Sequence, residues 1–168
     1  MKMKKKIQIV TPVYNEEKNI EYTIVSFFNN ISDNNFDLEF IVSEDGSSDE
    51  SVSVIKALSK KYKVKLFSSK KRKNYTDSVL FGLSKATSEI VAFVDSDGQY
   101  DPTDLLRMYS KLKKGTFVLD VKQHKIVENY ERFIPDFSMT ETWFAIFYIT
   151  LGLGLILILD FYGRKKEV

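Results

Sequence analysis

Two carboxylates stand two residues apart near the middle of the chain. Asp95 and Asp97, followed by Gln99, come directly after the unbroken apolar run of residues 90–94. Paired carboxylates repel each other unless a cation compensates, and carboxylate and amide oxygens are ligands that hard divalent cations prefer. We therefore predict a site for Mg²⁺ or Mn²⁺ on Asp95, Asp97 and Gln99. Such a metal would in turn hold a diphosphate.

A second polar group follows an earlier apolar run. Residues 44–49 begin where the run of residues 36–43 ends, and Tyr14 follows the first apolar run of the chain. A carboxylate such as Asp45 can accept hydrogen bonds from a base N–H or a ribose hydroxyl, while Gly46 allows a close backbone approach. The Tyr14 ring can flank a base. These residue types indicate a nucleotide site.

Acidic residues near the start of a helix often serve only as caps. We assign Asp101 and Asp104 to this role because Pro102 follows Asp101 as a first helical residue would. Asp49, or one of the serines before it, is a candidate cap for the helix that follows. Asp95 and Asp97 lie one loop earlier, directly after a buried strand, so the metal interpretation is favoured there.

The elements that must position these residues alternate between strand and helix patterns. Helical spacing of apolar residues marks the segments 20–31, 52–58, 78–86 and 102–112, and strand-like runs mark 7–10, 36–43, 64–67, 90–94 and 116–121. Repeated strand–helix units predict an α/β fold with a mainly parallel sheet flanked by helices. Ligands bind at the carboxyl ends of the strands in such sheets, where the polar groups described above lie.

The C-terminal segment is strongly apolar. Residues 142–159 carry no charge, and apolar residues resume at Phe161 after Asp160. About twenty helical residues span roughly 30 Å of hydrocarbon, so we predict one transmembrane helix over residues 142–163. A buried core helix is the alternative, and it is less favoured because the segment is apolar on all sides. The predicted organisation is a domain over residues 1–121, a connector over 122–141, the membrane helix and a basic tail over 164–168.

The composition excludes several classes of function. The chain of 168 residues has no cysteine and a single histidine, His124, which excludes thiolate zinc sites, cysteine nucleophiles and multi-histidine metal sites. A formal net charge of +2 argues against nucleic acid as a partner. The basic stretch over residues 60–73 is interpreted as a solvated face, although it could steer anionic ligands. The apolar stretch near the N-terminus is too short for a signal peptide, so we expect a single-pass membrane protein whose domain is cytoplasmic.

Taken together, the segments TPVYNEE (11–17), SEDGSSD (43–49) and VDSDGQ (94–99) resemble the motifs of the family 2 glycosyltransferases of GT-A fold, especially the dolichyl-phosphate or polyprenyl-phosphate sugar synthases. The resemblance covers residues 7–114. It implies an inverting transfer from a UDP- or GDP-linked sugar to an acceptor such as a polyprenyl phosphate, with Mg²⁺ or Mn²⁺ as cofactor. The positions that it implies are Pro12, Tyr14, Glu16, Asp45 and Asp95 for the nucleotide-sugar, Asp95, Asp97 and Gln99 for the metal, and Asp97 for catalysis.

The chain departs from this family in three places. Glu44-Asp45-Gly46 replaces the usual Asp-Asp-Gly, and we expect Asp45 to be the acid that binds. Residues 73–78 lack the glycines that the family often places there, and the segment 115–141 is short for the second half of a catalytic domain. The alternative function is therefore a catalytically degenerate module that binds a nucleotide-sugar and metal but lacks an acceptor site. A phosphatase of the haloacid-dehalogenase type fits poorly, because that chemistry normally uses the first strand.

Overall fold

The computed structural model describes residues 4–31, 36–112, 117–121 and 155–160. Strands and helices alternate through most of this range, as the sequence predicts. The strands are β1 (Lys5–Val13), β2 (Phe36–Glu44), β3 (Val64–Ser68), β4 (Ile90–Phe93), β5 (Phe117–Val121) and β6 (Leu155–Asp160). The helices are α1 (Ile20–Ile31), α2 (Ser51–Leu58), α3 (Tyr75–Lys85) and α4 (Pro102–Lys111).

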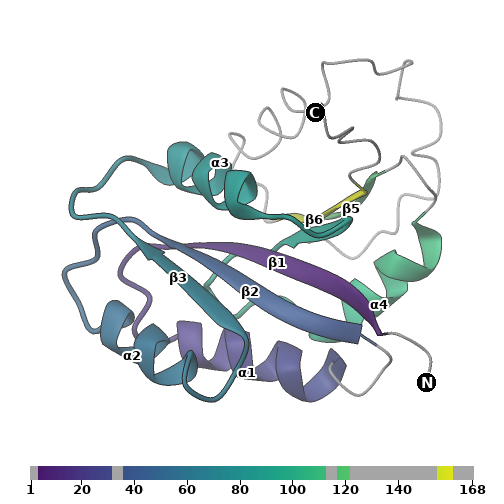
Figure 1. The fold of residues 1–168 in the computed structure, drawn as a ribbon, viewed down its shortest axis with the longest axis horizontal. Coiled ribbons are helices and arrows are strands. Elements are labelled where there is room, and N and C mark those ends of the chain that lie inside the picture. The colour runs from purple at the N-terminus through teal and green to yellow at the C-terminus, as the bar shows by residue number, and fades with distance from the viewer. Residues whose placement is uncertain (1–3, 32–35, 113–116, 122–154, 161–168) are drawn as a thin grey trace, which may run out of the picture.

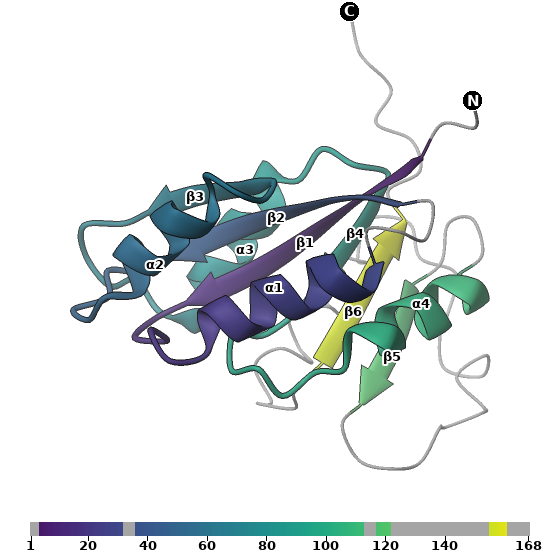
Figure 2. The ribbon, with the colours of Figure 1, turned by 90° about the horizontal axis from the view of Figure 1, so that it is seen from below.

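The described strands form a single sheet in the order β3-β2-β1-β4-β6-β5 (Figure 1; β4 is labelled in Figure 2). Strands β1 to β4 are parallel, while β6 pairs antiparallel with both β4 and β5. The predicted α/β fold with a mainly parallel sheet and flanking helices is confirmed. Parallel neighbours need crossover connections, and α1, α2 and α3 supply them.

Helices cover both faces of the sheet. Figure 2 shows α1, α2 and α4 on one face, whereas α3 lies on the other. The larger core lies under the first group, where α1 buries Ile20, Ile24, Phe27 and Ile31 at helical spacing. The smaller core lies under α3, whose Val79 packs with residues of the central strands. This layering leaves the loops after β1, β2 and β4 at one end of the sheet.

The start of α4 agrees with the prediction from sequence. The Asp101 carboxylate accepts a hydrogen bond from the Thr103 backbone N–H at 2.8 Å, and Pro102 occupies the first helical position. Hydrogen bonds from Thr103 hold the pKa of Asp101 below its ordinary value. Asp104 lies in the first turn and pairs with Arg107 at 2.8 Å. The capping role predicted for Asp101 is therefore confirmed, while the partner found for Asp104 is the Arg107 side chain one turn further along the helix.

A polar network joins strands β1, β2 and β3. Glu39 of β2 lies opposite Gln8 of β1 in the register and accepts a hydrogen bond from the Gln8 amide. Its carboxylate also pairs with Lys6 at 2.9 Å and with Lys65 at 3.0 Å. The Gln8 side-chain oxygen accepts two backbone N–H bonds, at 2.6 and 2.7 Å, from the turn before β4. The network therefore links four successive segments of the fold.

The C-terminal apolar segment differs from the prediction. Residues Leu155–Asp160, which were expected within a transmembrane helix, form the strand β6 between β4 and β5. A short apolar run cannot be assigned to helix or strand by periodicity alone, and here the edge of β4 supplies backbone partners for a strand. The predicted helix is therefore wrong for residues 155–160. Over the described residues, no helix combines the length and apolar character needed to cross a membrane.

Other predictions fall outside the described residues. These concern the connector, the remaining parts of the predicted membrane segment, the basic tail and the single histidine. They cover residues 122–141, 142–154, 161–163, 164–168 and His124. Membrane attachment, cytoplasmic orientation and the domain limits accordingly stay predictions.

Candidate functional site

The ends of three neighbouring strands meet at one edge of the sheet. The backbone N–H of Asp45 donates to the carbonyl of Val13 at 2.9 Å, which joins the ends of β2 and β1. On the other side, the Val94 N–H donates to the carbonyl of Val10 at 3.0 Å, which joins β4 to β1. The polar segments that follow β1, β2 and β4 therefore begin side by side, as the order of a parallel sheet requires.

The loops after β1 and β2 are fastened to each other through Asn15. This residue adopts a φ of 55°, a left-handed conformation that Asn tolerates better than most residues. Its backbone N–H donates to the Ser47 hydroxyl at 3.0 Å, and its side-chain oxygen accepts from the Ser48 N–H at 2.9 Å. Pro12 lies in β1 opposite Ser43, and it is buried at the start of this edge. The first two predicted motifs thus form one connected surface.

Glu16 and Asp49 both have structural partners in these loops. The Glu16 carbonyl accepts N–H bonds from the start of α1, and its carboxylate accepts from the Asn19 amide at 2.9 Å. Asp49 accepts from the Ser51 N–H at 3.0 Å and from the Glu17 N–H at 3.1 Å. The N-cap position of α2 is occupied by Glu50, so Asp49 lies one residue before the predicted cap position and its carboxylate joins the start of α2 to the loop after β1.

The adjacent acids Glu44 and Asp45 have different surroundings. The Glu44 carboxylate accepts hydrogen bonds from the Ser47 N–H and the Ser68 hydroxyl, so it closes the loop after β2. Asp45 is 4% exposed and accepts from the Lys73 backbone N–H at 2.9 Å. Both acids are therefore buried and have hydrogen-bond partners within the protein. The assignment of Asp45 to a ligand stays a prediction.

Gly46 lies where the loop before α3 crosses the end of β2. Its φ is +75°, and a Cβ built there would lie 2.9 Å from the backbone nitrogen of Arg72. A side chain is therefore excluded both by the backbone conformation and by the neighbouring main chain. The predicted close backbone approach at Gly46 is made by the protein's own loop.

Substituting Gly46 should consequently destabilise the folded protein. We expect Gly46→Ala to lower the free energy of unfolding by about 1–2 kcal/mol, the cost of a left-handed residue with a Cβ. Urea unfolding followed by circular dichroism measures this change, with Ser84→Ala on the exposed face of α3 as the control. Gly46→Asn should recover only part of the loss, because Asn tolerates the φ but still places a Cβ near Arg72. Wild-type stability in Gly46→Ala would contradict this account.

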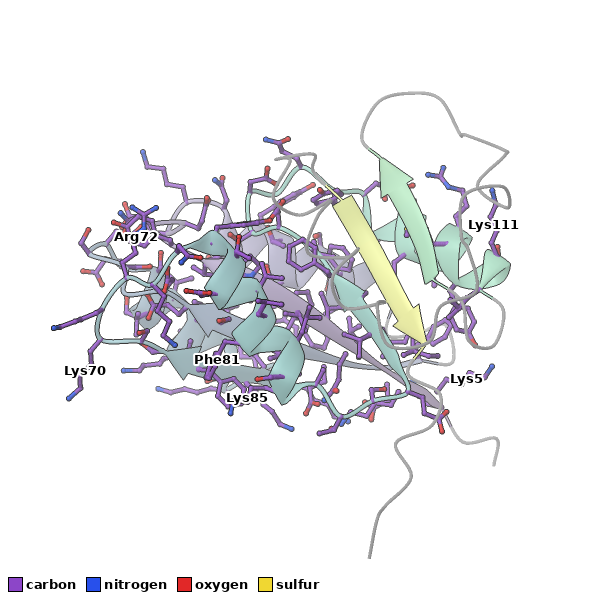
Figure 3. The ribbon with its side chains drawn as sticks, turned by 90° about the horizontal axis from the view of Figure 1, so that it is seen from above. Lys5, Lys70, Arg72, Phe81, Lys85 and Lys111 are labelled. Atoms are coloured by element: carbon purple, nitrogen blue, oxygen red, sulfur yellow. The ribbon has the colours of Figure 1, made fainter. Side chains whose placement is uncertain are left out.

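The loop before α3 brings positive charge to the site. The Arg72 guanidinium lies over the Tyr14 ring, 3.9 Å from its centroid, and Tyr14 is 36% exposed. Figure 3 shows Lys70 and Arg72 at the end of the molecule opposite Lys5, which begins β1. Cations at this end favour anionic ligands. Tyr14 thus presents an aromatic face whose position is set by a cation–π contact.

A small cavity lies beside Asp45, between the ends of β2 and β3 and the start of α3. Its volume is about 260 Å³, and it combines serine hydroxyls, aromatic rings and charges of both signs. The residues that line it are Ser43, Glu44, Asp45, Phe67, Ser68, Ser69, Lys70, Lys73, Ser78 and Phe81. A polar ligand of modest size could be bound here by hydrogen bonds to Asp45.

The acids after β4 offer oxygen ligands only. Asp97 accepts a hydrogen bond from the Gln99 backbone N–H at 3.0 Å, which shapes the turn that carries both residues. Within the described ranges, no group of three or more His, Cys, Asp or Glu residues is placed to hold a metal. Two carboxylates fit a Mg²⁺ or Mn²⁺ ion that takes its remaining ligands from water and from substrate phosphates. The donor set on Asp95, Asp97 and Gln99 is therefore compatible with the predicted metal.

Tyr75, at the start of α3, contacts this group of acids and was not predicted from the sequence. Its hydroxyl donates to Asp95 Oδ1 at 2.6 Å. Partial burial, followed by the charge of Asp95 and its hydrogen bond, raises the pKa of Tyr75 well above the ordinary value of 10.0. The phenol therefore stays protonated, as a donor, at neutral pH. The one feature of the sequence that drew attention to this segment was that residues 73–78 lack the glycines that the family often places there.

Comparison with known proteins agrees with this geometry. The model of the family described as "Glycosyl transferase family 2" matches residues 8–161. A dolichol-phosphate mannosyltransferase of Pyrococcus furiosus is 28% identical over 111 residues, which are 66% of this chain and 31% of that protein. An uncharacterized glycosyltransferase of Haemophilus influenzae is 35% identical over 92 residues, 54% of this chain and 36% of that protein. The chain thus spans about a third of the length of these curated relatives.

One solved structure with a similar fold contains a divalent metal ion and a nucleotide. Glucosyl-3-phosphoglycerate synthase from Mycobacterium tuberculosis, in complex with Mn²⁺, UDP and glucosyl-3-phosphoglycerate, gives a TM-score of 0.50 at 26% identity. The match covers 63% of this chain and 39% of that one. Because the family model spans most of the chain and the strand-end motifs lie together at one edge, we conclude that the chain belongs to glycosyl transferase family 2.

Proposed function

We propose that this protein binds a nucleotide-diphospho-sugar at the edge formed by the ends of β2, β1 and β4 and transfers the sugar, with inversion, to an acceptor. The observation that carries the proposal is the convergence of the three motifs there, linked by Asn15, Asp45 and Tyr75. Membership of glycosyl transferase family 2 supports it. The structure with Mn²⁺ and UDP, at 26% identity, supports the choice of ligands.

Each motif has a distinct task in this proposal. The Tyr14 ring flanks the base, and Asp45 accepts a hydrogen bond from the base or the ribose. Glu16, in the loop after β1, and Pro12, near the end of β1, are assigned to contacts with the nucleotide. Asp95 and Asp97, with Gln99, hold Mg²⁺ or Mn²⁺.

The proposed reaction is a single displacement at the anomeric carbon. An acceptor oxygen forms a bond to this carbon while the bond to the diphosphate breaks, so the nucleoside diphosphate leaves with the bonding electron pair. The chemistry that a bound Mg²⁺ or Mn²⁺ supplies is stabilisation of the charge that develops on the leaving diphosphate. Asp97 would contribute to catalysis by holding that ion.

The proposed acceptor is a lipid phosphate, such as a polyprenyl phosphate. The relative from Pyrococcus furiosus is named a dolichol-phosphate mannosyltransferase, which supports this class of acceptor. A phosphomonoester has a second pKa of about 6, so its oxygen is already largely ionised at neutral pH. The acceptor then needs little help from a protein base. We place this reaction at the cytoplasmic surface of a membrane.

The test is isothermal titration of UDP- and GDP-linked sugars into the full chain, with Mn²⁺ or with EDTA. We expect one nucleotide to bind in the presence of Mn²⁺ and to bind at least about tenfold more weakly in EDTA. Transfer to a polyprenyl phosphate is then followed with a radiolabelled sugar. Binding together with transfer would support the proposal, and binding without transfer to any acceptor would favour the degenerate donor-binding module. Failure of a folded protein to bind any of these donors would refute both.

A further inference from the structure

A short segment at the start of α3 contacts two separate acids of the site. The Lys73 backbone N–H donates to Asp45 Oδ1 at 2.9 Å, and the Tyr75 hydroxyl donates to Asp95 Oδ1 at 2.6 Å. Two consecutive Cα–Cα distances of about 3.8 Å place Lys73 and Tyr75 at most about 7.6 Å apart along the backbone. The segment therefore connects the acid assigned to the nucleotide with one of the acids assigned to the metal.

The backbone of this segment is held in place by its own cap. Asn74 is the N-cap of α3, and its side-chain oxygen accepts from the Asp77 N–H at 2.8 Å. The Asn74 amide also donates to the Asp77 carboxylate at 2.7 Å. These bonds fix the first turn of α3, and Tyr75 is the first residue of that helix. The position of the phenol is thus determined by a helix start and not by a free loop.

We propose that Tyr75 is a positioning residue that orients the Asp95 carboxylate for the divalent cation, and that residues 73–75 couple the nucleotide end of the site to its metal end. The inference rests on the proposed function, because it assigns a task to Tyr75 within that same site. Hydrogen bonds from outer residues to ligating carboxylates fix the orientation of the carboxylate plane. The hydroxyl on Oδ1 restricts Asp95 in this way before any ligand arrives.

The matched variant is Tyr75→Phe, which keeps the ring and removes only the hydroxyl. We expect the Kd for Mn²⁺ to rise about tenfold, the lower end of the usual effect of losing such a partner. Free and bound Mn²⁺ are separated by electron paramagnetic resonance, with the ion alone and with UDP or GDP added. The control is Tyr62→Phe, which removes a hydroxyl near the N-terminal end of β3, just before Val64.

A second variant and a second measurement distinguish the loss of Asp95 positioning from general damage to the fold. Asn74→Ala removes the cap but keeps the Tyr75 hydroxyl, and we expect a smaller rise in the Kd for Mn²⁺, about two- to threefold, because the hydroxyl remains. Nucleotide affinity in EDTA should stay within about twofold of wild type in Tyr75→Phe, since no cation is then involved and the bond from the Lys73 N–H to Asp45 is kept. Urea unfolding confirms that each variant is folded.

Three results would overturn the inference. The first is unchanged or tighter Mn²⁺ binding by Tyr75→Phe, and the second is an equal loss of nucleotide affinity with Mn²⁺ and with EDTA. The third is failure of the wild-type protein to bind Mn²⁺ in any arm. The proposed function is tested separately, by the binding and transfer of a nucleotide-sugar by the wild-type protein. A Tyr75→Phe substitution without effect on Mn²⁺ binding would therefore not contradict the proposed function.

Discussion

Asp97→Asn should lose metal-dependent nucleotide-sugar binding. Removing one of two carboxylates leaves Asp95 as the single charged ligand, and an amide oxygen is a poorer partner for a hard divalent cation. We expect at least about a 100-fold rise in the Kd for the donor in Mn²⁺, which is ~2.7 kcal/mol of binding free energy. Isothermal titration in Mn²⁺ and in EDTA measures the effect, and the EDTA value should not change.

The matched control for Asp97→Asn is Asp37→Asn. Asp37 lies at the start of β2, at the far end of the sheet, and pairs with Lys63 at 2.5 Å. Its loss removes the same charge from the protein without touching the strand-end acids. Equal effects of the two substitutions would show that net charge, and not a metal at Asp97, governs donor binding.

Glu39→Gln should cost the fold more stability than an ordinary surface substitution. Burial of Glu39 raises its pKa, but hydrogen bonds from Gln8, Lys6 and Lys65 outweigh that effect and hold the pKa at about 2. A carboxyl whose pKa falls from 4.5 on folding contributes stability above pH 4.5, and this contribution disappears as the pH falls toward 2. We expect Glu39→Gln to lower the free energy of unfolding at pH 7 by about 2–3 kcal/mol.

The pH dependence distinguishes this network from a packing effect. Urea unfolding at pH 7, 5, 4 and 3 should show that the difference in the free energy of unfolding between wild type and Glu39→Gln shrinks below pH 4.5, because Glu39 of the unfolded chain takes up a proton there while Glu39 of the folded protein stays ionised down to about pH 2. Glu89→Gln, an exposed position just before β4, serves as the control and should change stability little. A difference that stayed constant from pH 7 to pH 3 would contradict the assignment of this stability to the Glu39 charge.

Much of the N-terminal fold could be predicted from residue patterns because each element satisfies a local rule. The buried stripe of α1 and the Asp101-Pro102 start of α4 are visible in the sequence and present in the structure. Strand β6 could not be predicted in this way. An apolar run such as residues 155–160 suits a strand or a helix, and its partner β4 lies far away in the chain. The choice depends on a non-local pairing that no local pattern encodes.

The same distinction applies to the site. The convergence of the acids at 45 and 95 follows from strand order, since parallel strands end at a common edge. Their link through residues 73–75 does not follow from it, because the path of the loop before α3 depends on packing against Gly46 and on the Asn74 cap. The residue types indicated only that this segment lacks the glycines that the family often places there. The contact between Tyr75 and Asp95 became visible in three dimensions.

The antiparallel pairing of β4 with β6 has a consequence for synthesis on the ribosome. Strands β1, β2 and β3 and the helices that join them emerge early, whereas β6 emerges only after residue 160 has been added. Until then one side of β4 presents unpaired N–H and C=O groups, and such an edge is a template for pairing with another nascent chain. Closing the sheet also requires contacts between distant residues, which form slowly. That side of β4 therefore gains its strand partner only once residues 155–160 have been synthesised.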